Sequence, residues 1–198
     1  MSEIELKIPL SENDFHRIEN MINHVEKSET LEFSSSEKIL KSDEYFSRYK
    51  TREERIKNGE FEVIRIRTEK SGGKLRSYFA TKRKSLVNGF EVNDEKETFV
   101  ENPEVLRSFL VESGFEIWFK KKKELISVFC ALKNGGAKCH LELEKVNGLL
   151  YVEIENVSSE DDEKNQKKIF SVLEKIVASL GLDIRNNDPR SWAEILKS

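Results

Sequence analysis

Cysteine, proline and histidine are scarce in this chain of 198 residues, which has two cysteines, three prolines and three histidines. Two cysteines cannot form the several disulfides of a disulfide scaffold, and the scattered histidines make no zinc-binding spacing with them. No apolar run is long enough to span a bilayer, and no Pro-, Gly- or Ser-rich stretch divides the chain. These absences exclude a membrane span, a collagen, a low-complexity tract and a disulfide-rich fold.

The two cysteines, Cys130 and Cys139, flank the turn-forming pair Asn134-Gly135 and would lie opposite each other in a hairpin. A cross-strand disulfide and two free thiols both fit this placement. We expect free thiols, because the N-terminal residues 1–10 carry no signal or transit peptide and a cytoplasmic location is therefore the default.

An excess of one charge sign is also lacking, since 34 Lys and Arg stand against 37 Asp and Glu, for a net charge of −3. This balance argues against a protein that binds polyanions through net charge alone. However, charged residues make up 36% of the chain, compared with roughly 25% in an average globular protein. The question is therefore where so many charged side chains lie.

Alternation of polar and apolar residues predicts a series of strands separated by Asn-Gly and Gly-Gly turns. The predicted strands span 2–8, 43–50, 60–69, 75–84, 87–100, 115–125, 126–133, 137–146 and 149–157. Residues 26–41 have no clear period and predict a loop or an irregular strand. The pattern indicates one domain, residues 1–198, with about eight mostly antiparallel strands joined largely by hairpins.

Three helices, and a short terminal one, are predicted from their capping residues and apolar periods. The first begins after Ser11, and the second begins at Asn102-Pro103 and runs to Gly114. Its apolar face is predicted to hold Val105, Leu106, Phe109 and Leu110. A long helix begins at Ser158 or Ser159 and ends at Gly181, and residues 188–192 open a short terminal helix.

The charged residues of the predicted strands lie on one face of each strand and are sorted by sign. Acidic pairs include Glu3 with Glu5, Glu142 with Glu144 and Glu153 with Glu155; basic pairs include Arg65 with Arg67 and Lys82 with Lys84. Lys121 and Lys123 are predicted to share a face with Phe115, Ile117 and Phe119. A face of this kind commonly lies in water.

A second interpretation is that these faces line the interior of a closed barrel. A solvated face usually mixes the two signs, whereas here acidic pairs lie on some strands and basic pairs on others. An interior of carboxylates and Lys or Arg would suit a polyanion with divalent cations, because carboxylates bind Mg²⁺ or Mn²⁺ and cationic side chains bind phosphate. No P-loop motif is present to bind phosphate in another way.

Residues 3–7, EIELK, resemble the ExExK signature of the CYTH superfamily, the triphosphate tunnel metalloenzymes. Further segments resemble that family's strands in the expected order. They are DEYF (43–46), IRIR (64–67), Thr81-Lys82, EKE (95–97), LEKVNGL (143–149), YVEIE (151–155) and DPRSW (188–192). The last is similar to the C-terminal PRSY of class IV adenylate cyclases. The resemblance implies an α+β fold with a closed antiparallel eight-stranded β-barrel, the triphosphate tunnel, flanked by helices.

The resemblance also implies roles for individual residues. Mg²⁺ or Mn²⁺ would be bound by Glu3, Glu5, Glu95, Glu97, Glu144, Glu153 and Glu155. The triphosphate would be bound by Lys7, Arg65, Arg67, Lys82, Lys84, Lys121, Lys123 and Arg190, with Lys7, Arg65 and Lys82 as the catalytic residues.

Three departures from the family pattern affect these roles. Glu144 stands where the family usually has Asp, and Lys82-Arg83-Lys84 replaces its KGP. The basic K-x-R strand has no clean copy in the lysine run 120–123, where Lys121 with Lys123 is the best register.

The implied function is an enzyme acting on a small-molecule triphosphate, with no nucleic-acid or membrane partner, as a monomer or homodimer. A class IV adenylate cyclase-like protein would convert ATP to cyclic AMP and pyrophosphate. A triphosphatase acting on inorganic triphosphate, ATP or thiamine triphosphate is the alternative, because both would bind the same triphosphate. A non-catalytic module that binds polyphosphate or nucleotide is a third possibility.

Overall fold

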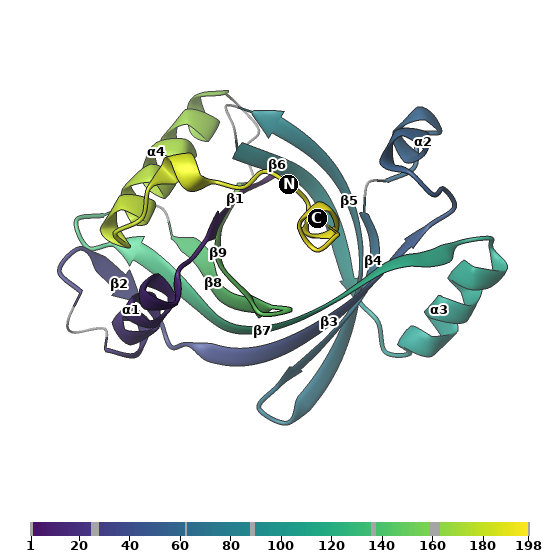
Figure 1. Cartoon of the computed structure of the whole chain (residues 1–198), viewed down its shortest axis with the longest axis horizontal. Coiled ribbons are helices and arrows are strands. Elements are labelled where there is room, and N and C mark those ends of the chain that lie inside the picture. The colour runs from purple at the N-terminus through teal and green to yellow at the C-terminus, as the bar shows by residue number, and fades with distance from the viewer. Residues whose placement is uncertain are drawn as a thin grey trace.

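Eight antiparallel strands close into a barrel in the computed structural model (Figure 1). The structure describes residues 2–24, 28–61, 63–87, 90–135, 138–158 and 163–197. Around the sheet the strand order is β2-β7-β3-β4-β5-β6-β1-β9-β8, and the pairing of β7 with β8 closes the ring. The predicted fold class, an α+β fold built on a closed eight-stranded antiparallel barrel with flanking helices, is confirmed.

The strands agree with the alternation pattern in most of their bounds. They are β1 Ser2–Pro9, β2 Leu31–Phe33, β3 Glu37–Ser47, β4 Val63–Ser71, β5 Lys74–Val87, β6 Phe90–Phe99, β7 Glu116–Leu132, β8 Cys139–Val146 and β9 Leu149–Ser158. The segment 26–41, predicted to be loop or irregular strand, contains β2 and the beginning of β3.

One long strand, β7, replaces the two strands predicted over 115–125 and 126–133. Its length lets it pair with β3 and β2 along one edge and with β8 along the other. Cys130 and Cys139 are directly opposite each other in the last of these pairings, and both are buried free thiols. The barrel is closed by this strand, because its two edges join the first and last parts of the sheet.

Five α-helices and one short 3₁₀ helix are present in the described ranges. They are α1 Glu12–Asn23, α2 Arg52–Lys57, α3 Pro103–Glu112, α4 Glu163–Ser179, the 3₁₀ helix Ile184–Asn186 and α5 Trp192–Ile195. The side chain of Ser11 caps α1 by accepting a hydrogen bond from the amide of Asp14, and Asn102 caps α3. The long helix was predicted to begin at Ser158 or Ser159; Ser158 belongs to β9, and Ser159 lies outside the described residues. Within the described residues, no helix has the length and apolar character needed to cross a membrane.

The apolar faces of the strands point outward and are covered by helices. Ile4, Leu6 and Ile8 of β1 are buried in a core that also contains residues of α1 and α4. On the other side, Phe46, Ile64 and Ile66 pack with Leu110 of α3. Since side chains alternate along a strand, the intervening charged residues face into the barrel.

Helix α3 presents a narrower apolar face to the barrel than the sequence predicts. Leu106 and Leu110 pack against the core, whereas Val105 and Phe109 are 65% and 64% exposed. The predicted apolar face is thus only partly buried, because a helix that lies on a curved sheet buries only the narrow stripe that faces it.

Candidate functional site

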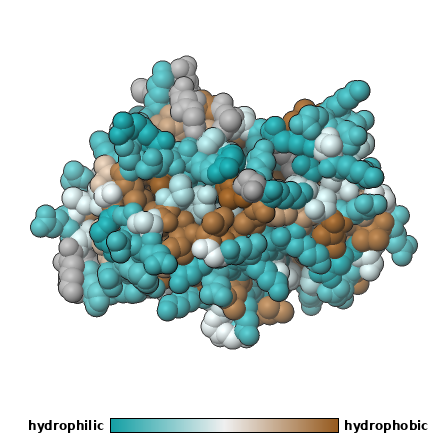
Figure 2. Space-filling view, in the orientation of Figure 1, coloured by the Kyte–Doolittle hydropathy of each residue, from teal (hydrophilic) through white to brown (hydrophobic). Residues whose placement is uncertain are grey.

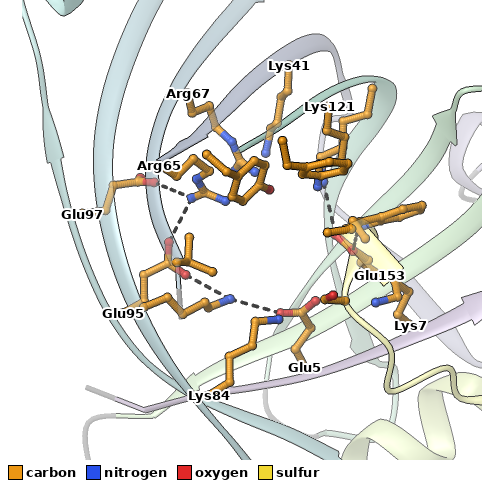
Figure 3. Close-up of a pocket in the computed structure, with 18 of the residues that line it drawn as sticks. Glu5, Lys7, Lys41, Arg65, Arg67, Lys84, Glu95, Glu97, Lys121 and Glu153 are labelled. Carbon is orange, nitrogen blue, oxygen red and sulfur yellow. Dashed lines mark hydrogen bonds and ion pairs between the residues drawn. The ribbon is translucent and has the colours of Figure 1, made fainter. Parts of the chain in front are cut away.

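The barrel encloses a cavity of about 360 Å³ whose wall is mostly charged (Figure 3). Acidic and basic side chains from all eight strands of the barrel line it together. They include Glu5, Lys7, Lys41, Arg65, Arg67, Glu69, Lys82, Lys84, Glu95, Glu97, Lys121, Lys123, Glu142, Glu153 and Glu155. The sorted charges of the sequence therefore lie inside a barrel, and the alternative of a solvated sheet face is wrong for these residues.

Three carboxylates from β8 and β9 form a buried acidic cluster, Glu142, Glu144 and Glu153. Oxygen atoms of the three lie within 4.8 Å of one another. Glu144 is fully buried, and its Oε2 has no hydrogen-bond partner among the described residues. Two members, Glu144 and Glu153, belong to the predicted metal-binding set. Glu142 does not, although its place two residues before Glu144 puts it on the same strand face.

The ammonium of Lys123 lies among these three carboxylates. Its Nζ is 2.8 Å from Glu142 and 3.2 Å from Glu153, and it also contacts Glu144. Burial alone would raise the pKa of Glu142 and of Glu153, but the charge of Lys123, together with the charges of neighbouring cations, outweighs it and holds both pKa values well below the ordinary range. For Glu144, burial followed by repulsion from Glu153 raises the pKa well above its usual value.

Across the cavity, Arg65 and Lys82 are paired with carboxylates of β6 and β1. The guanidinium of Arg65 lies 3.0 Å from Glu95 and 3.2 Å from Glu97, and Lys82 Nζ lies 3.1 Å from Glu95 and 3.3 Å from Glu5. The Nε of Arg65 is buried and has no hydrogen-bond partner in the described chain. Five of the predicted carboxylates and cations are thus brought together here, away from the Glu142–Glu144–Glu153 cluster.

A buried carboxylate that the predicted site did not include, Asp43, orients the neighbouring basic residues. Its oxygens accept hydrogen bonds of 2.8 and 3.0 Å from Arg67, and Lys121 Nζ is 3.6 Å away. Asp43 is the first residue of the DEYF segment, whose resemblance to a family strand could have indicated this role. Lys41, another residue missing from the predicted set, lies 2.5 Å from Glu142. Its strand was predicted as irregular, which concealed its position.

The C-terminal segment covers one end of the barrel. In Figure 1 helix α5 lies within the ring of strands, and in the space-filling view of the same orientation atoms fill that ring (Figure 2). Trp192 lines the cavity and donates a hydrogen bond of 2.7 Å to Glu153. The Nζ atoms of Lys7 and Lys121 lie 5.4 and 5.1 Å from the centre of its ring, a cation–π arrangement.

An aromatic wall at the cavity arises from a β-bulge. Tyr45 and Phe46 of β3 pair with Phe119 and Ile117 of β7, so Trp118 is an additional residue between them. Trp118 and Phe119 both line the cavity, whereas Phe115 and Ile117 pack outside against the α3 core. The prediction that Phe115 and Ile117 share a face with Lys121 and Lys123 is therefore wrong, because the bulge reverses the alternation.

Helix α2, which the sequence analysis missed, brings two arginines to this aromatic wall. Arg52 and Arg55 line the cavity, and the guanidinium of Arg55 lies 4.1 Å from the centre of the Trp118 ring. The capping box of Thr51 and Glu54 was the available sequence signal for this helix.

The remaining predicted residues have other surroundings. Lys84 pairs with Glu91 at 2.6 Å, and Glu155 with His140 at 2.7 Å. The side chain of Arg190 is 53% exposed and pairs with Asp188, while its carbonyl accepts a hydrogen bond of 2.6 Å from Lys7. The side chain of Glu3 lies outside what the structure describes.

The donor set of the Glu142–Glu144–Glu153 cluster fits a hard divalent cation. All three donors are carboxylate oxygens, the type that Mg²⁺ and Mn²⁺ prefer over nitrogen or sulfur. The buried Oε2 of Glu144 also supplies an oxygen that no described residue occupies. Among the described residues, no comparable group of His or Cys donors, which softer metals prefer, is present.

Comparisons with known proteins show likeness of fold. No protein-family model matches the chain, and no curated protein matches it. The PH1819 protein of Pyrococcus horikoshii OT3 has a TM-score of 0.73 and 22% identity, over 98% of each chain. A candidate adenylate cyclase of Vibrio parahaemolyticus has a TM-score of 0.67 and 18% identity, over 99% of this chain and 98% of that one. A Mimivirus capping enzyme triphosphatase has a TM-score of 0.50 and 8% identity, over 91% and 89%. These identities establish a shared fold alone.

Proposed function

We propose that this protein is a divalent-metal-dependent enzyme of the CYTH superfamily that binds a triphosphate inside its barrel and, as a class IV adenylate cyclase-like protein, converts ATP to cyclic AMP and pyrophosphate. The observation that carries the proposal is the cavity wall, where buried cations face a buried cluster of carboxylates. Such a wall is costly to build without a ligand of high negative charge, because taking many charges out of water costs free energy even where they are paired with one another.

The cations would hold the phosphate chain from several sides. Arg65 and Arg67 offer planar guanidinium groups that can bind two phosphate oxygens at once, and Lys82 and Lys121 offer ammonium groups. Asp43 keeps Arg67 extended into the cavity, so little reorganisation is needed when phosphate binds. The charge that develops on phosphate oxygens would be stabilised by these groups.

Glu142, Glu144 and Glu153, with Glu5 as a further carboxylate of the wall, are the residues that would hold Mg²⁺ or Mn²⁺. A bound divalent ion would supply Lewis-acid stabilisation of phosphate oxygens. In the cyclase reaction the ribose 3′-hydroxyl loses its proton to solvent and its oxygen bonds to the α-phosphorus. The bond from that phosphorus to the α–β bridging oxygen breaks, and pyrophosphate leaves with this oxygen. Lys7, which is buried and lines the cavity, is placed to bind the phosphate chain.

The aromatic wall favours an organic triphosphate over an inorganic one. Trp118 and Phe119 offer ring faces beside the charged cavity, and aromatic rings stack on nucleobases. The similarity of residues 188–192 to the PRSY of class IV cyclases and the fold shared with the Vibrio protein support the same choice. A triphosphatase, in which water attacks the γ-phosphorus, is the second candidate, supported by the fold shared with the viral triphosphatase.

Phosphorus NMR tests the proposal directly. ATP and, separately, inorganic triphosphate are incubated with the protein and Mg²⁺ or Mn²⁺. Pyrophosphate together with cyclic AMP is the expected result, whereas orthophosphate would identify a triphosphatase. Tight binding without turnover under either metal would mean a non-catalytic binding module.

A further inference from the structure

Lys123 occupies a position that distinguishes it from the other lysines of the barrel. It is 3% exposed, and its ammonium contacts all three carboxylates of the Glu142–Glu144–Glu153 cluster. Its contacts of 2.8 and 3.2 Å with Glu142 and Glu153 are ordinary charge-assisted hydrogen-bond distances. A cation is therefore already seated at the centre of the oxygen donors that would hold a metal.

Access to Glu144 depends on this lysine. Lys123, Glu142 and Glu153 line the cavity, whereas Glu144 is fully buried and is not part of the cavity wall. Lys123 lines the cavity and its ammonium contacts Glu144, so a divalent ion bound by Glu144 would be repelled by that ammonium. Metal binding by all three carboxylates thus requires the ammonium to leave.

In the empty cavity, the displaced ammonium would lie close to other cations. The other cationic groups near Lys123 include Lys121 on the same strand and Lys41 on the paired strand, and like charges repel. Without an anion, the three carboxylates are the favourable place for the ammonium. A triphosphate in the cavity would provide negative charge on the opposite side, to which the ammonium could move.

We propose that the ammonium of Lys123 holds the place of a divalent metal ion among Glu142, Glu144 and Glu153, and that it moves to the phosphate chain when a triphosphate binds. The inference rests on the proposed function, since it needs a triphosphate in the barrel. Metal and triphosphate then strengthen each other's binding, and by linkage the coupling is the same in both directions. Lys123 is a positioning residue in this scheme. Its movement from the carboxylate oxygens to the phosphate oxygens couples metal binding to triphosphate binding.

Manganese binding in the absence of triphosphate tests the first half of the proposal. The free Mn²⁺ signal in electron paramagnetic resonance reports the affinity of the wild type and of Lys123→Met and Lys121→Met. Lys121→Met is the matched control, because it removes the same charge from the same strand face but from a side chain that pairs with Asp43. We expect Lys123→Met to bind Mn²⁺ about tenfold more tightly than the wild type. Lys121→Met should change the affinity much less.

Sulfate tests the second half of the proposal, the movement of the Lys123 ammonium to an anion. This test uses the wild type and therefore holds even if Lys123→Met fails to fold. Sulfate offers oxygens to the cavity cations but binds Mn²⁺ weakly. We expect sulfate to increase the affinity of the wild type for Mn²⁺ relative to chloride at the same ionic strength. In folded Lys123→Met this increase should be lost.

Two results would overturn the proposal. One is an equal gain in Mn²⁺ affinity in both lysine variants, which would show a general charge effect; the other is a wild-type Mn²⁺ affinity that sulfate does not change. Calorimetry of inorganic triphosphate with Mg²⁺ on the wild type separates this failure from that of the proposed function. If triphosphate does not bind, the function itself is refuted; if it binds and the Mn²⁺ tests fail, only the role of Lys123 is refuted.

Discussion

Asp43 on β3 accepts two hydrogen bonds, of 2.8 and 3.0 Å, from the guanidinium of Arg67 on the adjacent strand β4. Asp43 is 1% exposed, so the pair is shielded from water. Burial would raise the pKa of Asp43, but the charges of Arg67 and then Lys121 outweigh it and hold the pKa well below its ordinary value. Arg67 is thereby held in one position inside the cavity before any ligand binds.

Asp43→Asn should destabilise the protein by about 3 kcal/mol at pH 7, because removing one partner of a buried ion pair leaves the other charge uncompensated. A group with a lowered pKa in the folded state stabilises above its unfolded pKa and loses this contribution as pH falls through the folded value. The difference between variant and wild type should therefore be largest above about pH 4 and shrink below it. Urea unfolding at several pH values measures this difference. The exposed Asp94→Asn is the control; an equal effect of both variants would contradict the prediction.

Arg65→Ala and Glu5→Gln should each abolish turnover while leaving the fold intact. The Arg65→Ala variant would lack the guanidinium that is proposed to bind phosphate. Preorganised donors of this kind commonly contribute about a hundredfold or more to the rate. Circular dichroism and thermal unfolding check the fold, and phosphorus NMR checks turnover. Arg76→Ala, a change of an exposed arginine on β5, serves as the control and should keep wild-type activity. Near-normal activity in both site variants would disprove the assignment of the cavity as the active site.

Binding of a triphosphate should weaken as pH rises above 8. Burial, followed by repulsion from Lys123, lowers the pKa of Lys121 to about 8 in the empty protein. An anion beside Lys121 favours its charged form, so the protein takes up a proton on binding above this pH. The affinity should then fall by up to about tenfold per pH unit.

Calorimetry of inorganic triphosphate between pH 7 and 9.5 measures this dependence, and Lys121→Arg is the control because arginine stays charged throughout the range. The same decline in that variant would mean that another group, or the ligand itself, is responsible.

Trp118→Leu should weaken the binding of ATP but not of inorganic triphosphate. Stacking on an aromatic side chain contributes about 1–3 kcal/mol per base, which corresponds to roughly 5- to 150-fold in affinity. Inorganic triphosphate has no ring, so its affinity should change little. Competition binding with both ligands provides the comparison, and the exposed Phe109→Leu on α3 controls for a general loss of aromatic surface. An equal loss of affinity for both ligands would show that the aromatic wall does not bind the base.

Most strands of the barrel were predictable from local alternation, because side chains of a strand alternate between two faces whatever the partner strand. The same pattern showed that the charged residues of each strand share one face, with acidic pairs on some strands and basic pairs on others. It could not show that Glu142 joins Glu153 and Lys123, because this depends on how β7, β8 and β9 pair. The alternation pattern also could not show that the carboxylates paired with Arg65 lie apart from those of the acidic cluster.

The sequence by itself determined that each strand has one charged and one apolar face, and which signs each strand carries. Only the tertiary structure decided which face is inside, since closure depends on the pairing of β7 with both β3 and β8, far apart along the chain. It also decided that Trp118 and Phe119 both reach the cavity, because a bulge in one pairing reverses the alternation. Local periods are set by backbone geometry, whereas closure and register are set by contacts between distant segments, and the proposed site depends on both.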